Sequence, residues 1–429
     1  MSSEWTFAPL ENCLDALIDY RGKTPEKTSA GIPLITAKII KGGRIEKPTE
    51  FIAADNYDSW MRRGIPKEGD VVLTVEAPLG EVAQLGPEKI ALAQRVVTLR
   101  GKKGILDNSY LLYLLQTEEM LEQLKSRATG TTVLGIKQSE LRKVPLSLPP
   151  INQQKAAAQT LKALDDRITL LRETNITLEA ITQALFKSWF VDFDPVRAKS
   201  EGLEPEGMDV ATAALFPDSF EESELGLVPK GWIWTNLVDV ATVLMGLSPK
   251  GDSYNFDGVG VPLINGPVEF GEYFPVKAKW TDMASRVSAF GDLIFCVRGS
   301  TTGRRVISDG EYCIGRGVCA IRSRHEAPGF IYQTINFGLD RLLSKTTGSV
   351  FPSLSGPDIK GFRVLCPSVK VIGAYEATTK FLLAQIQNNQ VQGQTLTQLR
   401  NTLLPRLISG QLSLPETEAS IENMLSEAV

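Results

Sequence analysis

The chain has 429 residues, of which 43% are hydrophobic and 22% are charged, so it has the composition of ordinary globular domains and is too long for one hydrophobic core. It contains no run of about 18 apolar residues, which excludes a membrane-spanning helix of the usual kind. The formal net charge of −4 argues mildly against a nucleic-acid-binding protein, unless the basic residues gather on one face.

The N-terminal stretch, residues 1–22, lacks the basic and then apolar layout of a secretory signal, so we expect a cytoplasmic protein. Five cysteines without a C-x-x-C pair predict reduced and mostly buried thiols. The single histidine, His325, cannot supply a multi-histidine metal site, and we expect no metal ligands in this chain.

The first 150 residues contain short strand-like runs separated by glycine and proline. The runs cover residues 32–40, 70–77 and 91–101, and residues 109–130 have the pattern of a helix that ends at a glycine. This mixture predicts a globular α+β domain over residues 1–150.

Residues 151–199 follow two prolines and have apolar residues at alternating spacings of three and four. The spacing predicts one long helix that packs along its length against another helix. A helix of about 40 residues spans roughly 60 Å. The predicted seam consists of Leu161, Leu164, Ile168, Leu171, Asn175, Leu178, Thr182, Leu185 and Trp189. Asn175 occupies a seam position where a polar residue fixes the register of a helix pair.

Three aromatic residues, Trp189, Phe190 and Phe193, end this helix. If they are exposed, aromatic residues at this density indicate a protein interface. If they are buried, they anchor the helix end to a neighbouring domain. The sequence leaves both interpretations open.

An acidic stretch with many prolines and glycines, residues 200–230, has the composition of a linker. After it, residues 231–367 match the first domain in order. Residues 260–269 match 31–40, Gly291-Asp292 matches Gly69-Asp70, and residues 313–322 match 91–100. Similarity at a nearly constant offset predicts a duplicated domain.

The long helix also recurs, over residues 368–412, before a C-terminal tail of residues 413–429. Its predicted seam consists of Leu382, Ile386, Asn389, Leu396, Leu403 and Leu407. Gly393 occupies the position that corresponds to Asn175, and Pro405 is expected to end or kink this helix. We expect the two helices to form an antiparallel coiled coil, although each could instead pack only on its own domain.

No catalytic motif is present. The chain lacks a phosphate-binding P-loop, a dinucleotide-binding glycine motif, a metalloprotease motif and a nucleophile elbow. The Asn-Pro-Pro-aromatic motif of amino-methylating enzymes is also missing, because the only Pro-Pro pair, Pro149-Pro150, follows a leucine. We therefore predict a binding protein rather than an enzyme.

Basic residues are concentrated in loops rich in glycine, serine and threonine, where they can approach phosphates or base edges. The sharpest case is residues 297–305. A solvated hairpin with scattered charges is the alternative interpretation. The predicted DNA contacts are Lys38, Lys41, Arg44, Arg62, Arg63, Lys137, Arg298, Ser300, Thr301, Thr302, Arg304, Arg305 and Arg316.

Over almost its whole length the chain resembles the DNA-specificity subunit of type I restriction–modification systems. The resemblance depends on the duplicated order of domains and long helices, on Leu148-Pro149-Pro150 followed by Gln153-Gln154, and on the run FKSWFVDFDPVRAK over residues 186–199.

This resemblance implies two target recognition domains, residues 1–150 and 231–367, each recognising half of a bipartite DNA site. It implies that the paired helices set the spacing, so that inserting four residues near Asn175 would change the spacer and leave both half-sites intact. It also implies two methyltransferase subunits that bring S-adenosylmethionine, and restriction subunits that use ATP and Mg, with no cofactor bound by this chain. We expect the methyltransferase to contact Trp189, Phe190 and Phe193.

Two other classes remain possible at this point. A coiled-coil protein–protein scaffold would show the same helices without DNA contact. A hydrolase or nuclease would need a catalytic site that the sequence does not display. Neither the target bases nor the contacting side chains follow from the sequence, because base recognition depends on a few side chains placed in a groove.

Overall fold

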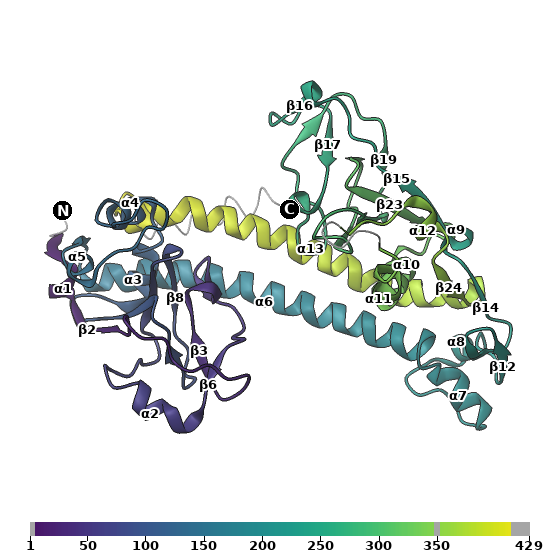
Figure 1. Ribbon diagram of the computed structural model, residues 1–429, viewed down its shortest axis with the longest axis horizontal. Coiled ribbons are helices and arrows are strands. Elements are labelled where there is room, and N and C mark those ends of the chain that lie inside the picture. The colour runs from purple at the N-terminus through teal and green to yellow at the C-terminus, as the bar shows by residue number, and fades with distance from the viewer. Residues whose placement is uncertain (1–4, 347–351, 413–429) are drawn as a thin grey trace. The chain divides into compact units, whose positions relative to one another are not determined.

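A computed structural model describes residues 5–346 and 352–412, and the predicted tail, residues 413–429, lies outside them. The chain divides into two compact units, which we call the first unit (residues 1–170 and 392–429) and the second unit (residues 171–391). Helices α6 (Ile151–Phe190) and α13 (Val369–Ile408) are unbroken in Figure 1, and each contributes residues to both units. No helix in the described ranges has the length and apolarity to cross a membrane.

The first unit is built around a four-stranded antiparallel sheet with the order β2-β10-β7-β8. Its strands are β2 (Leu14–Asp19), β10 (Val96–Gly101), β7 (Val71–Val75) and β8 (Leu79–Gln84). The sheet β6-β3-β9 and two strand pairs complete it, with β6 (Phe51–Ile52), β3 (Ile32–Ile35), β9 (Ala91–Leu92), β1 (Thr6–Pro9), β11 (Pro145–Leu148), β4 (Ile40–Lys41) and β5 (Arg44–Ile45). Its helices are α1 (Leu10–Cys13), α2 (Tyr57–Trp60), α3 (Asn108–Leu114), α4 (Glu118–Ser126) and α5 (Gln138–Arg142), with 3-10 turns η1 (Ala37–Ile39) and η2 (Ala54–Asn56).

The second unit repeats this sheet with the order β15-β23-β20-β21. Its strands are β15 (Ala241–Met245), β23 (Val318–Ser323), β20 (Leu293–Cys296) and β21 (Arg305–Ile307). The remaining strands are β16 (Tyr254–Asn255), β18 (Trp280–Thr281), β17 (Val261–Ile264), β22 (Tyr312–Ile314), β19 (Val287–Ser288), β14 (Ile233–Asn236), β24 (Arg363–Cys366), β12 (Phe220–Ser223) and β13 (Gly226–Pro229). The helices are α7 (Asp194–Ser200), α8 (Val210–Ala213), α9 (Leu237–Val240), α10 (Pro328–Phe337), α11 (Leu339–Leu343) and α12 (Gly356–Lys360), with η3 (Gly251–Ser253) and η4 (Pro267–Glu269).

The duplication is confirmed by an ion pair that recurs at the same place in both sheets. Asp70, just before β7, accepts two hydrogen bonds from Arg100 on β10, at 2.8 Å and 2.7 Å. Asp292, just before β20, accepts two from Arg322 on β23, at 2.7 Å and 2.9 Å. Each aspartate is a buried acceptor with a bidentate arginine partner, and in each case the hydrogen bonds raise the pKa of the arginine.

The predicted seams face inward. Their leucine, isoleucine, threonine and asparagine side chains are buried, except that Leu178, Leu185 and Leu382 are half-buried. In the second unit the Asn389 side chain bonds to Asn175, and the Tyr375 hydroxyl donates to the carbonyl of Thr182 at 3.1 Å. Because rising numbers in α6 meet falling numbers in α13, the helices pair in antiparallel fashion. In the first unit Arg400 of α13 forms an ion pair of 2.7 Å with Asp165 of α6.

The helix pair contains a buried asparagine pair, formed by Asn175 and Asn389. Asn389 Nδ2 donates to Asn175 Oδ1 at 2.8 Å, and Asn175 Nδ2 donates to the carbonyl of Ile386 at 3.3 Å. Gln385 also donates to Asn389 Oδ1 at 2.7 Å. Both asparagines are buried, so these bonds replace those lost with water. The repeat aligns Asn175 with Gly393, but its partner in space is Asn389.

Pro405 does not end the second helix at its own position, whereas the sequence predicted an end or a kink there. Helix α13 continues to Ile408, with Pro405 inside its last turn. Proline removes one backbone donor from the helix, and the burial of Leu403, Leu404 and Leu407 on the same stretch offsets this loss.

The stretch predicted as a linker, residues 200–230, contains structure of its own. It includes α8 and the hairpin of β12 and β13, and Phe216 is buried beside Trp189 with ring centroids 5.1 Å apart. Composition indicated a linker because prolines, glycines and acidic residues dominate the stretch, whereas a few aromatic residues suffice to attach it to the core.

Candidate nucleic-acid interface

Four segments of the second unit converge on an open polar cavity of about 630 Å³. They are the loop after β15, the end of β17, the end of β20 and the loop between β22 and β23. The lining residues are Ser248, Pro249, Gly251, Tyr254, Asn265, Arg298, Arg316 and Gly317. The cavity therefore combines two guanidinium groups with an amide, two hydroxyls and exposed backbone.

Two glycines allow these loops to approach each other. A Cβ atom on Gly315 would lie 1.9 Å from Asn265 Oδ1, and a Cβ atom on Gly317 would lie 2.2 Å from the carbonyl oxygen of Asn265. Any larger residue would push the loops apart. The Arg316 backbone N–H donates to Ser248 Oγ at 3.1 Å, which attaches the Gly-Arg-Gly loop to the loop after β15.

The charge of this cavity is uncompensated. Arg298 and Arg316 are exposed, and neither guanidinium forms an ion pair among the described residues. No aspartate or glutamate is among the lining residues. A pair of arginines beside backbone N–H groups, hydroxyls and an amide suits phosphate oxygens and the acceptor edge of a base.

The corresponding edge of the first unit is organised differently. Arg21 donates to Asp19 Oδ2 from Nε at 2.8 Å and from Nη2 at 2.7 Å, and its Nη1 donates to the carbonyl of Ile136 at 2.5 Å. Arg63 in turn donates to the carbonyl of Arg21 at 2.7 Å. The basic groups here are thus partly used in holding loops together.

Comparison with known proteins gives a consistent result. Residues 18–180 match the family described as Type I restriction modification DNA specificity domain. The type I restriction enzyme MjaIX specificity subunit of Methanocaldococcus jannaschii is 27% identical over 407 residues, covering 92% of this chain and 90% of that protein. The HindI specificity subunit of Haemophilus influenzae is 24% identical over 387 residues, covering 76% and 82%.

The chain is thus similar over almost its whole length to type I restriction–modification specificity subunits. A solved relative supports the fold. The crystal structure of the type I restriction–modification S subunit from M. genitalium has a TM-score of 0.58 at 17% identity, covering 95% of this chain and 96% of that one. The resemblance stated from sequence motifs is confirmed.

Four of the basic residues predicted for the first domain of this chain fall into two groups. Arg63 and Lys137 lie near the Arg21 contacts, since Ile136 precedes Lys137. Lys41 and Arg44 face each other across the β4–β5 hairpin, where Lys41 forms an exposed ion pair with Glu46 at 2.9 Å. The two remaining predicted residues, Lys38 and Arg62, are exposed.

In the second domain Arg298 and Arg316 line the same cavity, although Arg298 follows β20 and Arg316 lies in the loop between β22 and β23. Ser300, Thr301, Thr302 and Arg304 occupy the turn between β20 and β21. Within this turn Thr302 Oγ1 donates to the carbonyls of Gly299 at 2.8 Å and Pro352 at 2.9 Å. Thr302 therefore holds the turn, and Arg304 remains exposed.

Arg305 is a corrected prediction. Its guanidinium points inward, where it bonds to Asn336 and donates to the carbonyl of Gly303 at 2.9 Å. Burial lowers the pKa of this guanidinium. Arg304 lies in the turn before β21, whereas Arg305 is the first residue of that strand, so the two neighbouring side chains take different directions.

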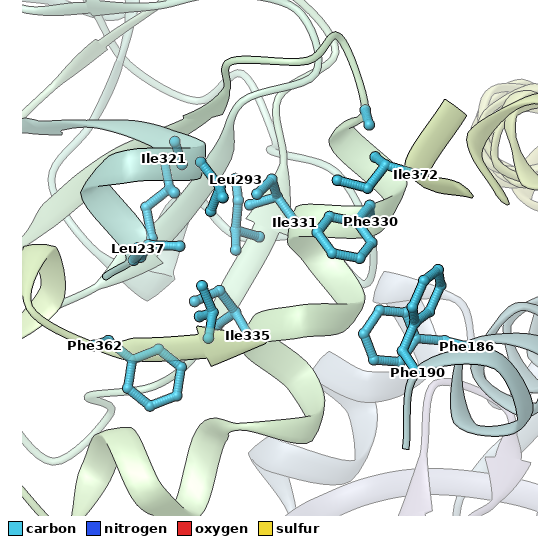
Figure 2. Close-up of a cluster of buried hydrophobic side chains, with 14 of the residues drawn as sticks. Phe186, Phe190, Leu237, Leu293, Ile321, Phe330, Ile331, Ile335, Phe362 and Ile372 are labelled. Atoms are coloured by element: carbon cyan, nitrogen blue, oxygen red, sulfur yellow. The ribbon is translucent and has the colours of Figure 1, made fainter. Parts of the chain in front are cut away.

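The aromatic end of α6 is the second correction. Trp189 and Phe190 are buried, and the ring centroids of Phe190 lie 5.2 Å from Phe330 and 5.3 Å from Tyr375. Figure 2 shows Phe186 and Phe190 side by side within this cluster. Phe193 is half-buried against Trp232, with centroids 5.8 Å apart. These residues anchor the helix end, so they are unavailable as an exposed partner surface.

Sequence reasoning missed Ser248, Asn265 and Arg21. Polar residues in loops are common, and nothing in their local pattern distinguishes these three. The glycines on both sides of Arg316 were a usable signal, because a Gly-Arg-Gly run in a strand-like segment indicates close backbone approach.

Proposed function

We propose that this specificity subunit recognises a bipartite double-stranded DNA target, with one half-site contacted by the globular domain of each unit. The observation that carries the proposal is a duplicated scaffold whose equivalent edges present different charged side chains. A repeated frame with different loops suits two related but unequal half-sites.

We further propose that the chain has no catalytic activity of its own and assembles with two methyltransferase subunits and with restriction subunits. S-adenosylmethionine, ATP and Mg would then be bound by those partners. Support comes from the family, from the specificity-subunit relatives, and from the missing catalytic motifs. Phosphate neutralisation shared with partner subunits would also reconcile the net charge of −4 with DNA binding.

In this proposal the paired helices set the spacer between the half-sites. The pairing of Asn175 with Asn389 means that an insertion in α6 alone would disrupt the seam. A matched insertion of one heptad in each helix keeps the seam and adds about 10 Å, or roughly three base pairs. We expect the spacer to lengthen while both half-sites keep their bases.

The test is co-expression with the methyltransferase subunit of the same system, followed by sequencing of modified bases. A bipartite motif that depends on this chain supports the proposal, and changed half-site bases in the heptad variant would contradict the role of the helices. A purified complex should also show sequence-specific DNA binding that weakens steeply with salt. Assembly with partners in the absence of any DNA specificity would instead identify a protein scaffold.

A further inference from the structure

The two edges that face the proposed half-sites can be aligned residue by residue. Val297 N–H donates to the carbonyl of Gly317 at 2.9 Å, and the Val297 carbonyl accepts from Leu354 at 2.9 Å. Val75 makes the same two bonds, with Arg95 and Ile136, both at 3.0 Å. The residues that follow, Arg298 and Glu76, therefore occupy the same place in the two units.

A second bridge supports this alignment. Arg298 pairs with Ser353, and Glu76 pairs with Gly135, in isolated antiparallel bridges. Arg298 also follows the buried Asp292 at the same interval as Glu76 follows Asp70.

The neighbouring strands, β23 and β10, show which residue of the first unit corresponds to Arg316. Arg316 precedes Arg322 at the same interval as Gln94 precedes Arg100, and both arginines hold the buried aspartates. The second unit thus has Arg298 and Arg316 where the first unit has Glu76 and Gln94. Glu76 forms no ion pair within the described part of the chain.

These differences have a direct chemical meaning at base edges. Arginine donates two hydrogen bonds to O6 and N7 of guanine, whereas glutamate accepts from the N4 amino group of cytosine. On the basis of the proposed function, we propose that Arg298 and Glu76 are specificity-determining residues. Arg298, together with Arg316, contacts a guanine in one half-site. Glu76 contacts a cytosine in the other half-site.

A general basic patch would have a different charge pattern. Phosphate contact would favour positive charge in both units, but the first unit places a carboxylate at this position. A carboxylate beside DNA is tolerable where it accepts from an amino group, and otherwise it repels the backbone.

The test compares the modified-base motifs of complexes with wild-type, Arg298→Ala, Arg298→Lys and Glu76→Gln chains. We expect Arg298→Ala to relax one G·C position of one half-site by about tenfold or more, and to leave the other half-site unchanged. Arg298→Lys should lose the same discrimination while retaining more affinity, because lysine keeps the charge but not the fork. Glu76→Gln should relax one G·C position of the other half-site.

The matched control is Arg172→Ala, an exposed arginine on α6 that does not line the cavity and is not among the predicted DNA contacts. It should leave the motif unchanged. Neither Arg298 nor Glu76 has a side-chain hydrogen bond or ion pair among the described residues that would support folding, and thermal unfolding of each purified complex verifies this.

Two failures can be told apart. If the wild-type complex shows no bipartite motif, the proposed function itself fails. If the wild-type motif is bipartite but Arg298→Ala and Glu76→Gln leave every position intact, or if each variant weakens all sites equally, the proposed function stands and this inference is overturned.

Discussion

The globular domains of the two units share their frame and differ at its edge. In both, a buried aspartate holds an arginine on the adjacent strand, and the flanking valines make the same backbone bonds. At the edge, an arginine in one unit corresponds to a glutamate in the other. A frame that keeps its register while its edge changes can present different chemistry to two half-sites.

The helix ends differ in a second way. In the second unit the end of α6 is covered by an aromatic cluster that includes Trp189, Phe216 and Trp232. In the first unit the end of α13 has Leu407 and Ile408 buried, but a cavity of about 730 Å³ remains beside Pro405. The second unit therefore depends more on aromatic packing at this place.

The largest effect should come from Trp189→Ala. Removing a buried tryptophan costs about 4 kcal/mol in the free energy of unfolding, whereas Leu407→Ala, its counterpart in the repeat, should cost about 3 kcal/mol. Urea unfolding of the full chain measures both. Unchanged stability together with lost methyltransferase binding would restore the interpretation of Trp189 as a partner contact.

A smaller effect should distinguish the two ion pairs. The side chain of Arg100 is 17% exposed and that of Arg322 is 53% exposed, although both aspartates are 1% exposed. Asp70→Ala leaves the more buried guanidinium unpaired and should cost about 3 kcal/mol, against roughly 1–2 kcal/mol for Asp292→Ala. Thermal unfolding of each variant provides the measurement. Equal losses would show that the exposure of the arginine does not matter.

The smallest net effect should come from removing both asparagines of the helix pair. Asn389→Leu alone leaves a buried amide without its donor and should cost about 1–2 kcal/mol, while the double variant with Asn175→Leu should be close to neutral. A double-mutant cycle by urea unfolding reports the coupling. If the double variant loses the sum of the single losses, the two side chains do not act as a pair.

The double asparagine variant also addresses the spacing of the half-sites. If the asparagine pair fixes the register, the apolar variant should modify sites with more than one spacer length. A single unchanged spacer would assign the register to the surrounding contacts, such as Tyr375 with Thr182.

Much of the fold follows from the sequence alone, because its signals are local and periodic. Spacings of three and four predicted both long helices, since a helix that buries one stripe must repeat apolar residues at that interval. The order of matching segments predicted the duplicated domain, and the Gly-Asp turns marked the same strand in each copy.

The tertiary structure decided the identity of partners and the exposure of side chains. Asn175 contacts Asn389 rather than Gly393, the residue that the repeat aligns with it. The repeat matches the two helices in the same direction, whereas in space they pair in opposite directions. Trp189 is buried beside Phe216, and Phe190 is buried beside Phe330 and Tyr375. Arg305 points inward, whereas Arg298 lines the open cavity. Such outcomes depend on contacts between segments far apart in the chain, which no local pattern contains.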